Sequence, residues 1–312
     1  MSLQKEAVSE RKEGIDSAIL VTGGRGFIGS HLVDRLSRDG YKVITFDNST
    51  KQIPTGETSI KHIQGDIADE EEIKRAVSQS KYVFHLAGVL GTSETIDDPV
   101  YAVRENIFGA LTVLEAIKDQ GKRGTMITIG GIDWPNPYAI TKKVAEDFSL
   151  MYQSEYGVDV KVVRGLNVYG PRQKHAPVRK AVPNFIVRAL QNEPLEVFGD
   201  GTQILDLVYV EDMAEVMIRS MQLRSYVHHV MDAGTGKGIT VNELARTIVG
   251  LTDSRSPIMH FPMRQGEPEH SVTLGDTRTL EAIGYVPSTP LVEGLRKTIL
   301  WYKEHLPEPT SK

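Results

Sequence analysis

The sequence predicts an α/β protein in which a doubly wound parallel sheet is followed by a smaller C-terminal domain. Two features of the 312 residues support this fold class. Short apolar segments with little polar alternation recur along the first half of the chain, and segments with 3.6-residue periodicity separate them. Such strands are buried on both faces, as they are in parallel sheets whose strands are joined by right-handed helical crossovers.

Six apolar segments are the predicted strands, and the segments between them predict helices. The strands are residues 18–21, 43–46, 60–63, 82–86, 125–129 and 160–163. The first connecting helix, residues 30–38, carries Leu32, Val33 and Leu36 on one face. Another helix begins at Asp98-Pro99, which is a favourable N-cap and first-turn pair.

The regular alternation ends near residue 171, where four prolines fall close together. We therefore predict a boundary there between the sheet domain and the smaller domain. The predicted parts are a polar N-terminal extension at 1–16, the sheet domain at 17–170 with 202–235 returning to it, and the smaller domain at 171–201 and 236–312. In the smaller domain we expect a helix at 182–190, a capping box from Thr240 to Glu243 and a final helix at 291–305.

Composition limits the classes of function. The chain has 36 Lys+Arg and 41 Asp+Glu, a net charge of −5, so no basic excess indicates a nucleic-acid partner. It has no cysteine, which excludes disulfides, thiolate metal sites and a cysteine nucleophile and fits a reducing compartment. No apolar run approaches the roughly 20 residues of a membrane span, and the first 16 residues are unlike a signal peptide. We expect a cytoplasmic protein without a metal, membrane or nucleic-acid partner.

A glycine-rich turn follows the first predicted strand directly. Gly23, Gly26 and Gly29 form a Gly-x-x-Gly-x-x-Gly turn that opens a helix. Glycine lets the backbone turn sharply and approach a pyrophosphate, whose charge is met by the amides and the dipole at the helix N-terminus. A strand before the turn and a helix after it favour a dinucleotide site, and hence a Rossmann-type sheet, over a turn without a ligand.

Acidic residues at the ends of the next two strands bear on the choice of dinucleotide. Asp47 ends the second strand, where a carboxylate accepts hydrogen bonds from ribose hydroxyls and repels a 2′-phosphate. This position favours NAD over NADP, although Arg25 and Lys51 are close in sequence. Asp66 and Ile67 after the third strand are candidates to flank the adenine; the alternative is a surface aspartate in a turn.

A tyrosine and a lysine follow the fifth predicted strand. Tyr138 and Lys142 are four residues apart, which places both on one face of the helix that begins near Pro137. The pKa of a tyrosine is ordinarily about 10, and a nearby ammonium and an oxidised nicotinamide ring lower it. Such a phenolate takes the proton of a substrate hydroxyl while hydride leaves for the nicotinamide.

Together these residues resemble the extended short-chain dehydrogenase/reductase superfamily, in particular its nucleotide-sugar epimerase/dehydratase branch of UDP-glucose 4-epimerase-like proteins. The resemblance covers about residues 19–305. The matching segments are TGGRGFIGSHL at 22–32, FDN at 46–48, GDI at 65–67, HLAG at 85–88, Asn106, YAITK at 138–142, RGLNVYGP at 164–171, FGDGTQ at 198–203 and VYVED at 208–212.

The resemblance implies tightly held NAD, a nucleoside diphosphate sugar as substrate, most simply UDP-linked, and a homodimer through helices near 98–118 and 138–156. The implied cofactor residues, besides those above, are Phe27, Ile28, Asn48, Leu86, Ala87, Gly88 and Asn106. The implied substrate residues are Asn167 and Arg264 near the diphosphate and Val197 and Phe198 at the base.

Two positions depart from the pattern of the resembling family. Its members carry a Ser-Ser/Thr pair after the fifth strand, whose second hydroxyl binds the reacting sugar oxygen; here Thr128 is the best remaining candidate, although neighbouring strand residues face opposite ways. Leu205 stands where relatives have an arginine for the diphosphate. Four basic residues are candidates to replace it, with a solvated basic loop as the alternative: Arg172, Lys174, Arg179 and Lys180.

The choice of reaction depends on the loop after the fifth strand. The resemblance implies that a dehydratase needs an Asp-Glu pair there and that decarboxylases tend to have a glutamate, whereas this chain has Gly130-Gly131. Asp133 and Glu94 are the carboxylates that the sequence offers in place of the missing acid or base. A 4-epimerase needs less, because its 4-keto intermediate turns over and takes the same hydride back. The sequence therefore favours 4-epimerisation of a UDP-hexose, with dehydration, decarboxylation or a non-catalytic NAD-binding sensor as alternatives.

Overall fold

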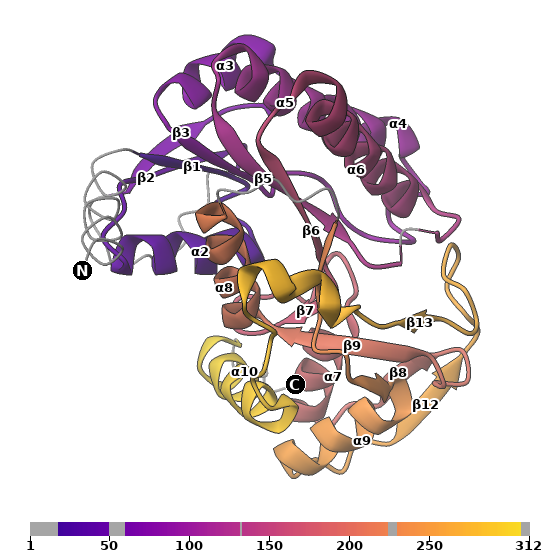
Figure 1. The fold of residues 1–312 in the computed structure, drawn as a ribbon. Helices are drawn as coiled ribbons and strands as arrows, with labels where there is room; N and C mark the ends of the chain where they lie inside the picture. Colours follow the sequence, from indigo (N-terminus) through magenta and orange to yellow (C-terminus); the bar gives the residue numbers. More distant parts are fainter. Residues whose placement is uncertain (1–17, 50–59, 132, 224–229, 307–312) are drawn as a thin grey trace.

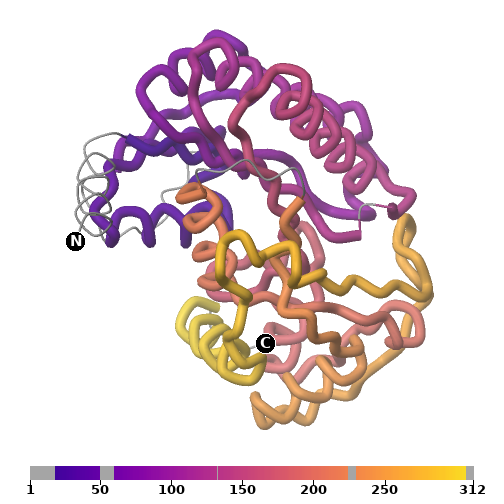
Figure 2. Tube along the Cα trace, viewed as in Figure 1, coloured from indigo at the N-terminus to yellow at the C-terminus, as the bar shows by residue number. Residues whose placement is uncertain are grey.

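The computed structural model describes residues 18–49, 60–131, 133–223 and 230–306. The expected N-terminal extension at 1–16 lies outside them. Figure 2 shows that the indigo-to-magenta half of the chain gathers on one side of the molecule and the orange-to-yellow half on the other. The chain forms two layered parts whose elements are given in turn below.

The first part is a seven-stranded sheet with the order β10-β6-β5-β4-β1-β2-β3, and every adjacent pair is parallel. Its strands are β1 (Ile19–Thr22), β2 (Val43–Asp47), β3 (Lys61–Gln64), β4 (Tyr82–His85), β5 (Arg123–Ile129), β6 (Val160–Gly165) and β10 (Met231–Ala233). The order reverses between β1 and β4, which is where doubly wound sheets bind dinucleotides. The predicted parallel sheet is confirmed (Figure 1).

Helices cover both faces of this sheet because successive strand residues point to opposite sides. They are α2 (Phe27–Arg38), α3 (Glu70–Ser78), α4 (Pro99–Val103), α5 (Gly109–Asp119), α6 (Pro137–Tyr156) and α8 (Val210–Gln222). Ile19 and Val21 of β1 pack in the core cluster of α2 and α8, whereas Leu20 packs in the cluster of α3 and α5.

The helix predicted to begin at Asp98-Pro99 is interrupted. Asp98 caps α4 as expected, since its carboxylate accepts a hydrogen bond of 2.9 Å from the Tyr101 amide. A π-helical turn, η1 (Arg104–Phe108), then separates α4 from α5. Such turns are frequent at functional sites, and this one carries Asn106.

The second part packs a small sheet and a strand pair against three helices. The four-stranded sheet contains β7 (Asn167–Tyr169), β9 (Ile204–Tyr209), β11 (Gly238–Thr240) and β13 (Val272–Thr273), and the pair contains β8 (Leu195–Phe198) and β12 (Ile258–Phe261). The helices are α7 (Ala181–Leu190), α9 (Val241–Thr252) and α10 (Leu291–His305), and a short 3₁₀ helix, η2 (Thr277–Ile283), precedes α10. The predicted capping box at Thr240 and Glu243 is present at the start of α9.

The segment 202–235 is shared between the two parts. Its strand β10 joins the large sheet beside β6, and α8 packs against α2. Its strand β9, by contrast, pairs with β7, β11 and β13 of the small sheet. The two parts are therefore joined by elements that alternate between them.

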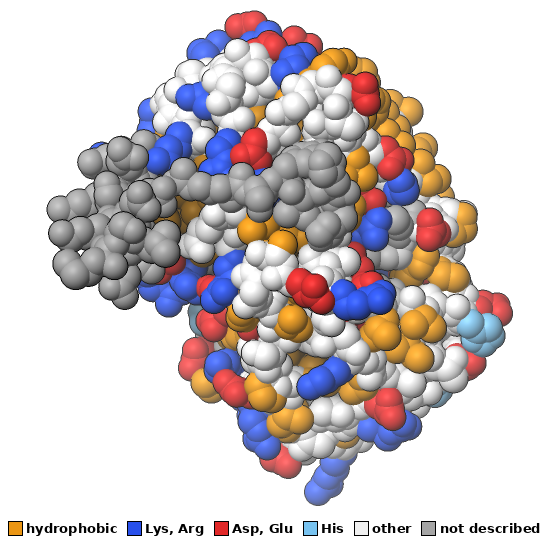
Figure 3. Space-filling model, viewed as in Figure 1, with side chains coloured by type: hydrophobic (Ala, Val, Ile, Leu, Met, Phe, Trp, Pro, Cys, Tyr) orange, Lys and Arg blue, Asp and Glu red, His pale blue; other side chains and the backbone are white. Residues whose placement is uncertain are grey.

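An apolar surface follows the outer helices of the large sheet. Exposed apolar side chains lie on α4, η1 and α6, and they are Val100, Tyr101, Val103, Phe108, Ile140 and Tyr156. Figure 3 shows hydrophobic side chains gathered along the edge formed by α4 and α6. Within the described ranges, no helix has both the length and the apolarity to cross a bilayer.

Candidate active site

The glycine turn between β1 and α2 leaves room for a ligand against the backbone. A Cβ at Gly29 would lie 2.1 Å from the Gly23 carbonyl oxygen, and Gly23 itself has a positive φ of 68°. Gly26 is the N-cap of α2 and no side chain caps it. The first amides of α2, at Phe27 and Ile28, therefore lack intrahelical acceptors and are available to a phosphate.

Asp47 lies at the end of β2, beside this turn. Its two carboxylate oxygens accept hydrogen bonds of 2.9 Å each from the Arg25 and Ser49 amides. These contacts fix the carboxylate, and each oxygen keeps a further lone pair for a ribose hydroxyl. The Arg25 guanidinium donates to the Ser49 carbonyl oxygen at 2.6 Å, so it is occupied by the chain itself. Lys51 lies outside the described residues.

The predicted adenine-flanking residues are placed less directly. Asp66 caps the turn after β3, where it accepts a hydrogen bond of 2.9 Å from the Ala68 amide and pairs with Arg104. The hydrogen bond from Arg104 lowers the pKa of Asp66 below its ordinary value. Ile67 is buried in the core against α5, and Asn48 is exposed. The Asp66 carboxylate is thus engaged within the chain, and the contact of Asp66 and Ile67 with the adenine stays a prediction.

The end of β4 is tied to the end of β1. The Leu86 and Ala87 amides both lie 3.3 Å from the Thr22 hydroxyl, which also forms a hydrogen bond of 2.9 Å with His85 Nδ1. His85 is 3% exposed, and its burial, together with the nearby Lys142 ammonium, lowers its pKa to about 3. A neutral histidine therefore supports the backbone at the switch point of the sheet.

Lys142 reaches the same edge of the sheet from α6. Its side chain is 7% exposed, and burial lowers its pKa to about 8. A Cβ at Gly88 would lie 3.1 Å from Lys142 Nζ and 2.4 Å from Asn106 Oδ1, so the glycine makes space for both groups. The Asn106 amide donates 3.0 Å to the Thr141 hydroxyl, which ties η1 to the residue next to Lys142.

Tyr138 stands in the first turn of α6, four residues before Lys142. Asn136 caps this helix by accepting a hydrogen bond of 2.9 Å from the Ala139 amide, and Pro137 occupies the first helical position. Burial raises the pKa of Tyr138 above its ordinary value. Its deprotonation thus depends on positive charge nearby, and Lys180 Nζ lies 5.7 Å from the centre of its ring.

The structure does not support the assignment of Thr128 as the hydroxyl that contacts the sugar. Thr128 is 2% exposed, and its hydroxyl donates a hydrogen bond of 2.9 Å to the buried carboxylate of Glu146. Glu146 also accepts 2.6 Å from the Arg164 guanidinium. The reason is the strand alternation: the Thr128 side chain faces α6, where a buried acceptor already holds it.

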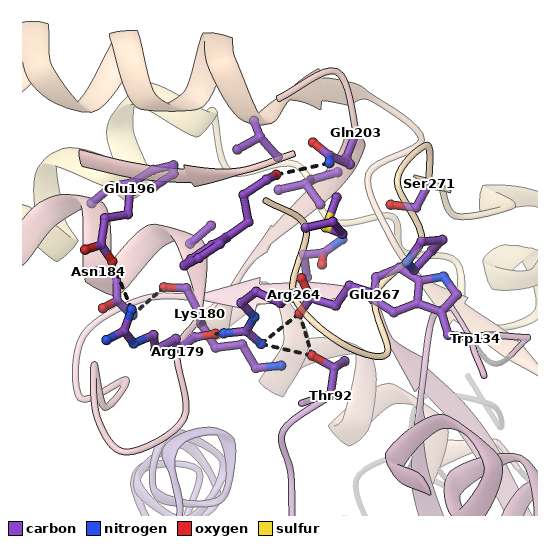
Figure 4. Close-up of a pocket in the computed structure, with 18 of the residues that line it drawn as sticks. Thr92, Trp134, Arg179, Lys180, Asn184, Glu196, Gln203, Arg264, Glu267 and Ser271 are labelled. Atoms are coloured by element: carbon purple, nitrogen blue, oxygen red, sulfur yellow. Dashed lines mark hydrogen bonds and ion pairs between the residues drawn. The ribbon is translucent and has the colours of Figure 1, made fainter. Parts of the chain in front are cut away.

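A cavity of about 180 Å³ opens between the two parts of the molecule. Three of the expected substrate residues, Asn167, Phe198 and Arg264, line it. Figure 4 shows Arg264 at the centre, with Thr92 below it, Trp134 to its right and Gln203 above it. Polar groups from both halves of the chain thus converge on one apolar-walled space, as in small-molecule sites.

Arg264 is oriented by several partners. Its guanidinium donates 2.8 Å to Glu267 and 3.0 Å to the Thr92 hydroxyl, and it lies 5.6 Å from the centre of the Phe198 ring. The side chain is 12% exposed, and its Nε is buried without a hydrogen-bond partner. The guanidinium is therefore preorganised and retains an unused donor.

Two expected substrate residues are not brought to the cavity. Arg172 has a backbone φ of 68°, and its guanidinium pairs with Asp34 of α2 at 2.7 Å. Val197 is fully buried in the core of the second part, since β8 alternates and directs Glu196 and Phe198 to the cavity instead. Only the main chain of Val197 remains available to a base.

The lining also decides between the basic residues that the sequence offered near Leu205. Leu205 itself lines the cavity, and so do Arg179 and Lys180. Arg172 and Lys174 are not among the lining residues. Of the four candidates, the two that reach the cavity are thus those of the segment immediately before α7.

Sequence reasoning missed several residues of the cavity, three of which lie close to the expected substrate residues or to the loop after β5. Thr92, Trp134 and Glu267 line it, from the segment after β4, the segment after β5 and the segment after β12. Glu267 had a detectable signal, because it stands three residues after Arg264. Nothing in the local pattern marked Thr92, whose role depends on a partner 172 residues away.

The residues present fit NAD. The uncapped N-terminus of α2 and the glycine turn suit a pyrophosphate, and the fixed carboxylate of Asp47 suits a ribose diol. Asn106 Oδ1 and Lys142 Nζ lie beside Gly88 at the end of β4, and Tyr138 stands four residues before Lys142 in α6. None of the three is among the residues that line the cavity, but Lys180, which lines it, lies 5.7 Å from the centre of the Tyr138 ring.

Comparisons with known proteins agree with this geometry. The model of the NAD dependent epimerase/dehydratase family matches residues 19–134 and 133–234. A putative UDP-glucose 4-epimerase of Methanocaldococcus jannaschii is 30% identical over 92% of this chain and 99% of its own. A UDP-N-acetyl-alpha-D-glucosaminuronate decarboxylase of Bacillus cytotoxicus is 31% identical over 91% and 97%.

Among solved structures, the crystal structure of UDP-glucose 4-epimerase with UDP-glucose from Thermotoga maritima is similar. It has a TM-score of 0.86 and 33% identity, and the match covers 93% of this chain and all of that one. The expected fold class, family and cofactor are thereby confirmed. The protein is a member of the NAD dependent epimerase/dehydratase family.

Proposed function

We propose that the protein is a 4-epimerase that acts on a UDP-linked hexose or hexose derivative with NAD as a resident cofactor. The observation that carries the proposal is the loop after β5. A Cβ at Gly130 would lie 2.8 Å from the Thr273 side chain, and Gly131 has a φ of 70° against Trp134. A second acid or base cannot stand at either position, which leaves Tyr138 as the proton-transfer group.

The two substitutes considered for that missing group are poorly suited. Asp133 is exposed. Glu94 is engaged, since its Oε1 accepts a hydrogen bond of 3.2 Å from the Arg179 amide and lies 3.8 Å from Arg264. Epimerisation requires no group beyond the pair on α6, whereas dehydration requires an additional acid and base.

The chain's own part in the reaction is proton transfer and charge stabilisation. Tyr138 takes the proton of the C4 hydroxyl while the C4 hydride leaves, which oxidises the sugar to a 4-keto form. Lys142, mostly protonated at neutral pH, stabilises the phenolate. NAD supplies the hydride acceptor and later the hydride donor. The 4-keto sugar rotates in the pocket, hydride adds to the other face of C4, and Tyr138 returns the proton to the C4 oxygen.

The cavity supports a nucleoside diphosphate sugar as the substrate. The ring of Phe198 offers a surface for a base, and Arg264 with Asn167 offers donors for a diphosphate. The similar proteins from M. jannaschii, B. cytotoxicus and T. maritima are named for UDP-sugars, which favours uridine as the base.

A homodimer through the outer helices fits the apolar surface of α4, η1 and α6. Tyr101, Val103 and Phe108 are exposed there beside Ile140 of α6. Burying such a patch against the same patch of a second copy is the usual symmetric arrangement. The cytoplasmic location stays a prediction.

Product analysis tests the proposed reaction. Purified protein is mixed, without added reductant, with UDP-linked hexoses, hexuronic acids and N-acetylhexosamines, and products are followed by proton NMR. A stereoisomer of unchanged mass is the expected product. Loss of water or carbon dioxide would replace epimerisation with dehydration or decarboxylation, and no turnover of any sugar would favour an NAD-binding sensor.

A further inference from the structure

A cavity lysine has no counter-ion. Lys180 is the residue just before α7, and it lines the cavity. No carboxylate of the described residues lies within ion-pair distance of its ammonium, although its neighbour Arg179 pairs with Glu196 at 2.9 Å. Figure 4 shows Lys180 beside Arg264 in the cavity. The chain thus holds one positive charge there that it does not neutralise.

Two acidic groups lie near this lysine without pairing with it. Glu267 accepts from Arg264 at 2.8 Å; Glu94 lies 3.8 Å from the same guanidinium, and its Oε2 is buried without a hydrogen-bond partner. Their charges raise the pKa of Lys180 less than burial lowers it. An ammonium that is removed from water without a close partner is costly, and an anion of the ligand relieves that cost.

The position of the charge indicates which part of the ligand it meets. Lys180 Nζ lies 5.7 Å from the Tyr138 ring, whereas Arg264 lies 5.6 Å from the ring of Phe198. Tyr138 must reach the reacting hydroxyl, so the group beside it is the hexose. Arg264 serves the diphosphate between hexose and base, and Lys180 is left facing the sugar.

We propose that Lys180 selects a nucleotide-linked hexuronic acid by forming an ion pair with the carboxylate that the hexose carries on C5. This inference rests on the proposed function and names its substrate class. A neutral hexose offers the ammonium hydroxyl groups only, whereas a carboxylate offers a full opposite charge to a partly buried ammonium. Lysine suits this role as a compact point charge on a flexible stem.

Calorimetric titration tests the proposal. The NAD-loaded protein is titrated with UDP, UDP-glucose and UDP-glucuronic acid, as wild type and as Lys180→Met. The wild type is expected to bind UDP-glucuronic acid more tightly than UDP-glucose. Lys180→Met is expected to weaken UDP-glucuronic acid by roughly thirtyfold or more, because one partner of a buried charge pair is removed. Its affinities for UDP and UDP-glucose should stay within about threefold.

A matched control is Lys174→Met, which removes the same charge from an exposed position of the same segment. It is expected to leave all three affinities unchanged. Lys180→Gln provides a second variant should the methionine disturb folding, and it is expected to show the same selective loss. An equal loss for UDP, UDP-glucose and UDP-glucuronic acid would assign Lys180 to the diphosphate and overturn the proposal, as would no loss at all.

The experiments distinguish a failure of the proposed epimerase reaction from a failure of the Lys180 proposal. Proton NMR of the same mixtures reports turnover. A Lys180-dependent preference for UDP-glucuronic acid without conversion of any sugar would remove the epimerase assignment and leave the carboxylate contact. Conversion of UDP-glucose with no Lys180-dependent preference would keep the epimerase assignment and overturn the carboxylate contact.

Discussion

The edge of the large sheet at the glycine turn, which we call the cofactor edge, and the cavity between the two parts differ in how many of their polar side-chain atoms have hydrogen-bond partners. Around the glycine turn, Asp47 and Asn106 have partners within the chain. Among the described residues, six buried side-chain atoms have no hydrogen-bond partner. Three of them, Arg264 Nε, Gln203 Oε1 and Glu94 Oε2, lie at or next to the cavity, and the others belong to Asp34, Arg172 and Gln173. The cofactor edge thus offers a ligand the free amides of α2 and leaves Asp47 and Asn106 held by the chain, whereas the cavity offers unpartnered side-chain atoms.

This difference has a physical origin. A dinucleotide that stays bound through every catalytic cycle is served best by rigid groups that the chain itself holds in position. A sugar that must rotate within the pocket is served by a space with few fixed contacts. The unpartnered donors of the cavity are then available to the part of the ligand that does not move. Mutations at the cofactor edge are therefore expected to reduce the retention of NAD. Mutations at the cavity are expected to change the turnover rate and the substrate specificity.

Tyr138→Phe tests the boundary between the two regions and has the largest expected effect. Loss of the phenol removes the proton-transfer group, so turnover should fall by at least about 100- to 10,000-fold. NAD should remain bound, because the glycine turn and Asp47 are untouched. Product formation by NMR and the absorbance of bound cofactor measure the two effects. Substantial remaining activity would take the base role away from Tyr138.

Acid titration tests a group that supports the cofactor edge. Because burial lowers the pKa of His85 to about 3, the unfolded chain binds a proton below about pH 6.5 that the folded chain does not. Stability from this group is present above pH 6.5 and is lost as pH falls toward 3, by roughly 1.4 kcal/mol per pH unit.

Urea unfolding at pH 7 and pH 4.5 measures this loss. His85→Gln should lose less stability over the interval than the wild type, by roughly 2 kcal/mol. The exposed His175→Gln should follow the wild type. Identical pH dependence in His85→Gln and the wild type would show that His85 does not remain neutral in the folded chain.

Thr128→Ala distinguishes a structural hydroxyl from a catalytic one. In the structure this hydroxyl stabilises the buried Glu146 carboxylate, so its loss should lower the free energy of unfolding by about 1–3 kcal/mol. Turnover should fall by less than about tenfold. Thr128→Ser keeps the hydroxyl and is expected to restore most of the stability. A drop in turnover of ten- to a hundredfold with unchanged stability would instead return Thr128 to the sugar.

The parts that sequence predicts well are those fixed by local rules. Strand periodicity, the glycine turn and the caps at Asp98 and Thr240 each depend on a few neighbouring residues, and all appear in the structure. The face of a strand on which a side chain lies, and the direction that a loop takes, are not fixed by such local rules. The resemblance implied Val197 at the base together with Phe198, but strand alternation directs the Val197 side chain to the core.

The basic segment before α7 shows the same limit. The sequence offers Arg172, Lys180 and two further basic residues as candidates at the start of the smaller domain, and Arg172 was the one expected at the substrate. In the structure Arg172 pairs with Asp34, far away in the chain, whereas Lys180 lines the cavity. Charge pairing across the fold, rather than local pattern, therefore sets the electrostatics of the cavity.

Arg172→Ala therefore has the smallest expected effect, and Arg264→Ala is its comparator. The Arg172–Asp34 ion pair is partly exposed, so its loss should cost about 1 kcal/mol or less of stability and leave KM for the nucleotide sugar within about twofold. Arg264→Ala removes a preorganised cavity guanidinium and should raise KM by roughly tenfold or more. If Arg172→Ala raised KM as much as Arg264→Ala, Arg172 would have to leave Asp34 for the diphosphate when substrate binds, and the cavity would gain a cation that the free structure keeps elsewhere.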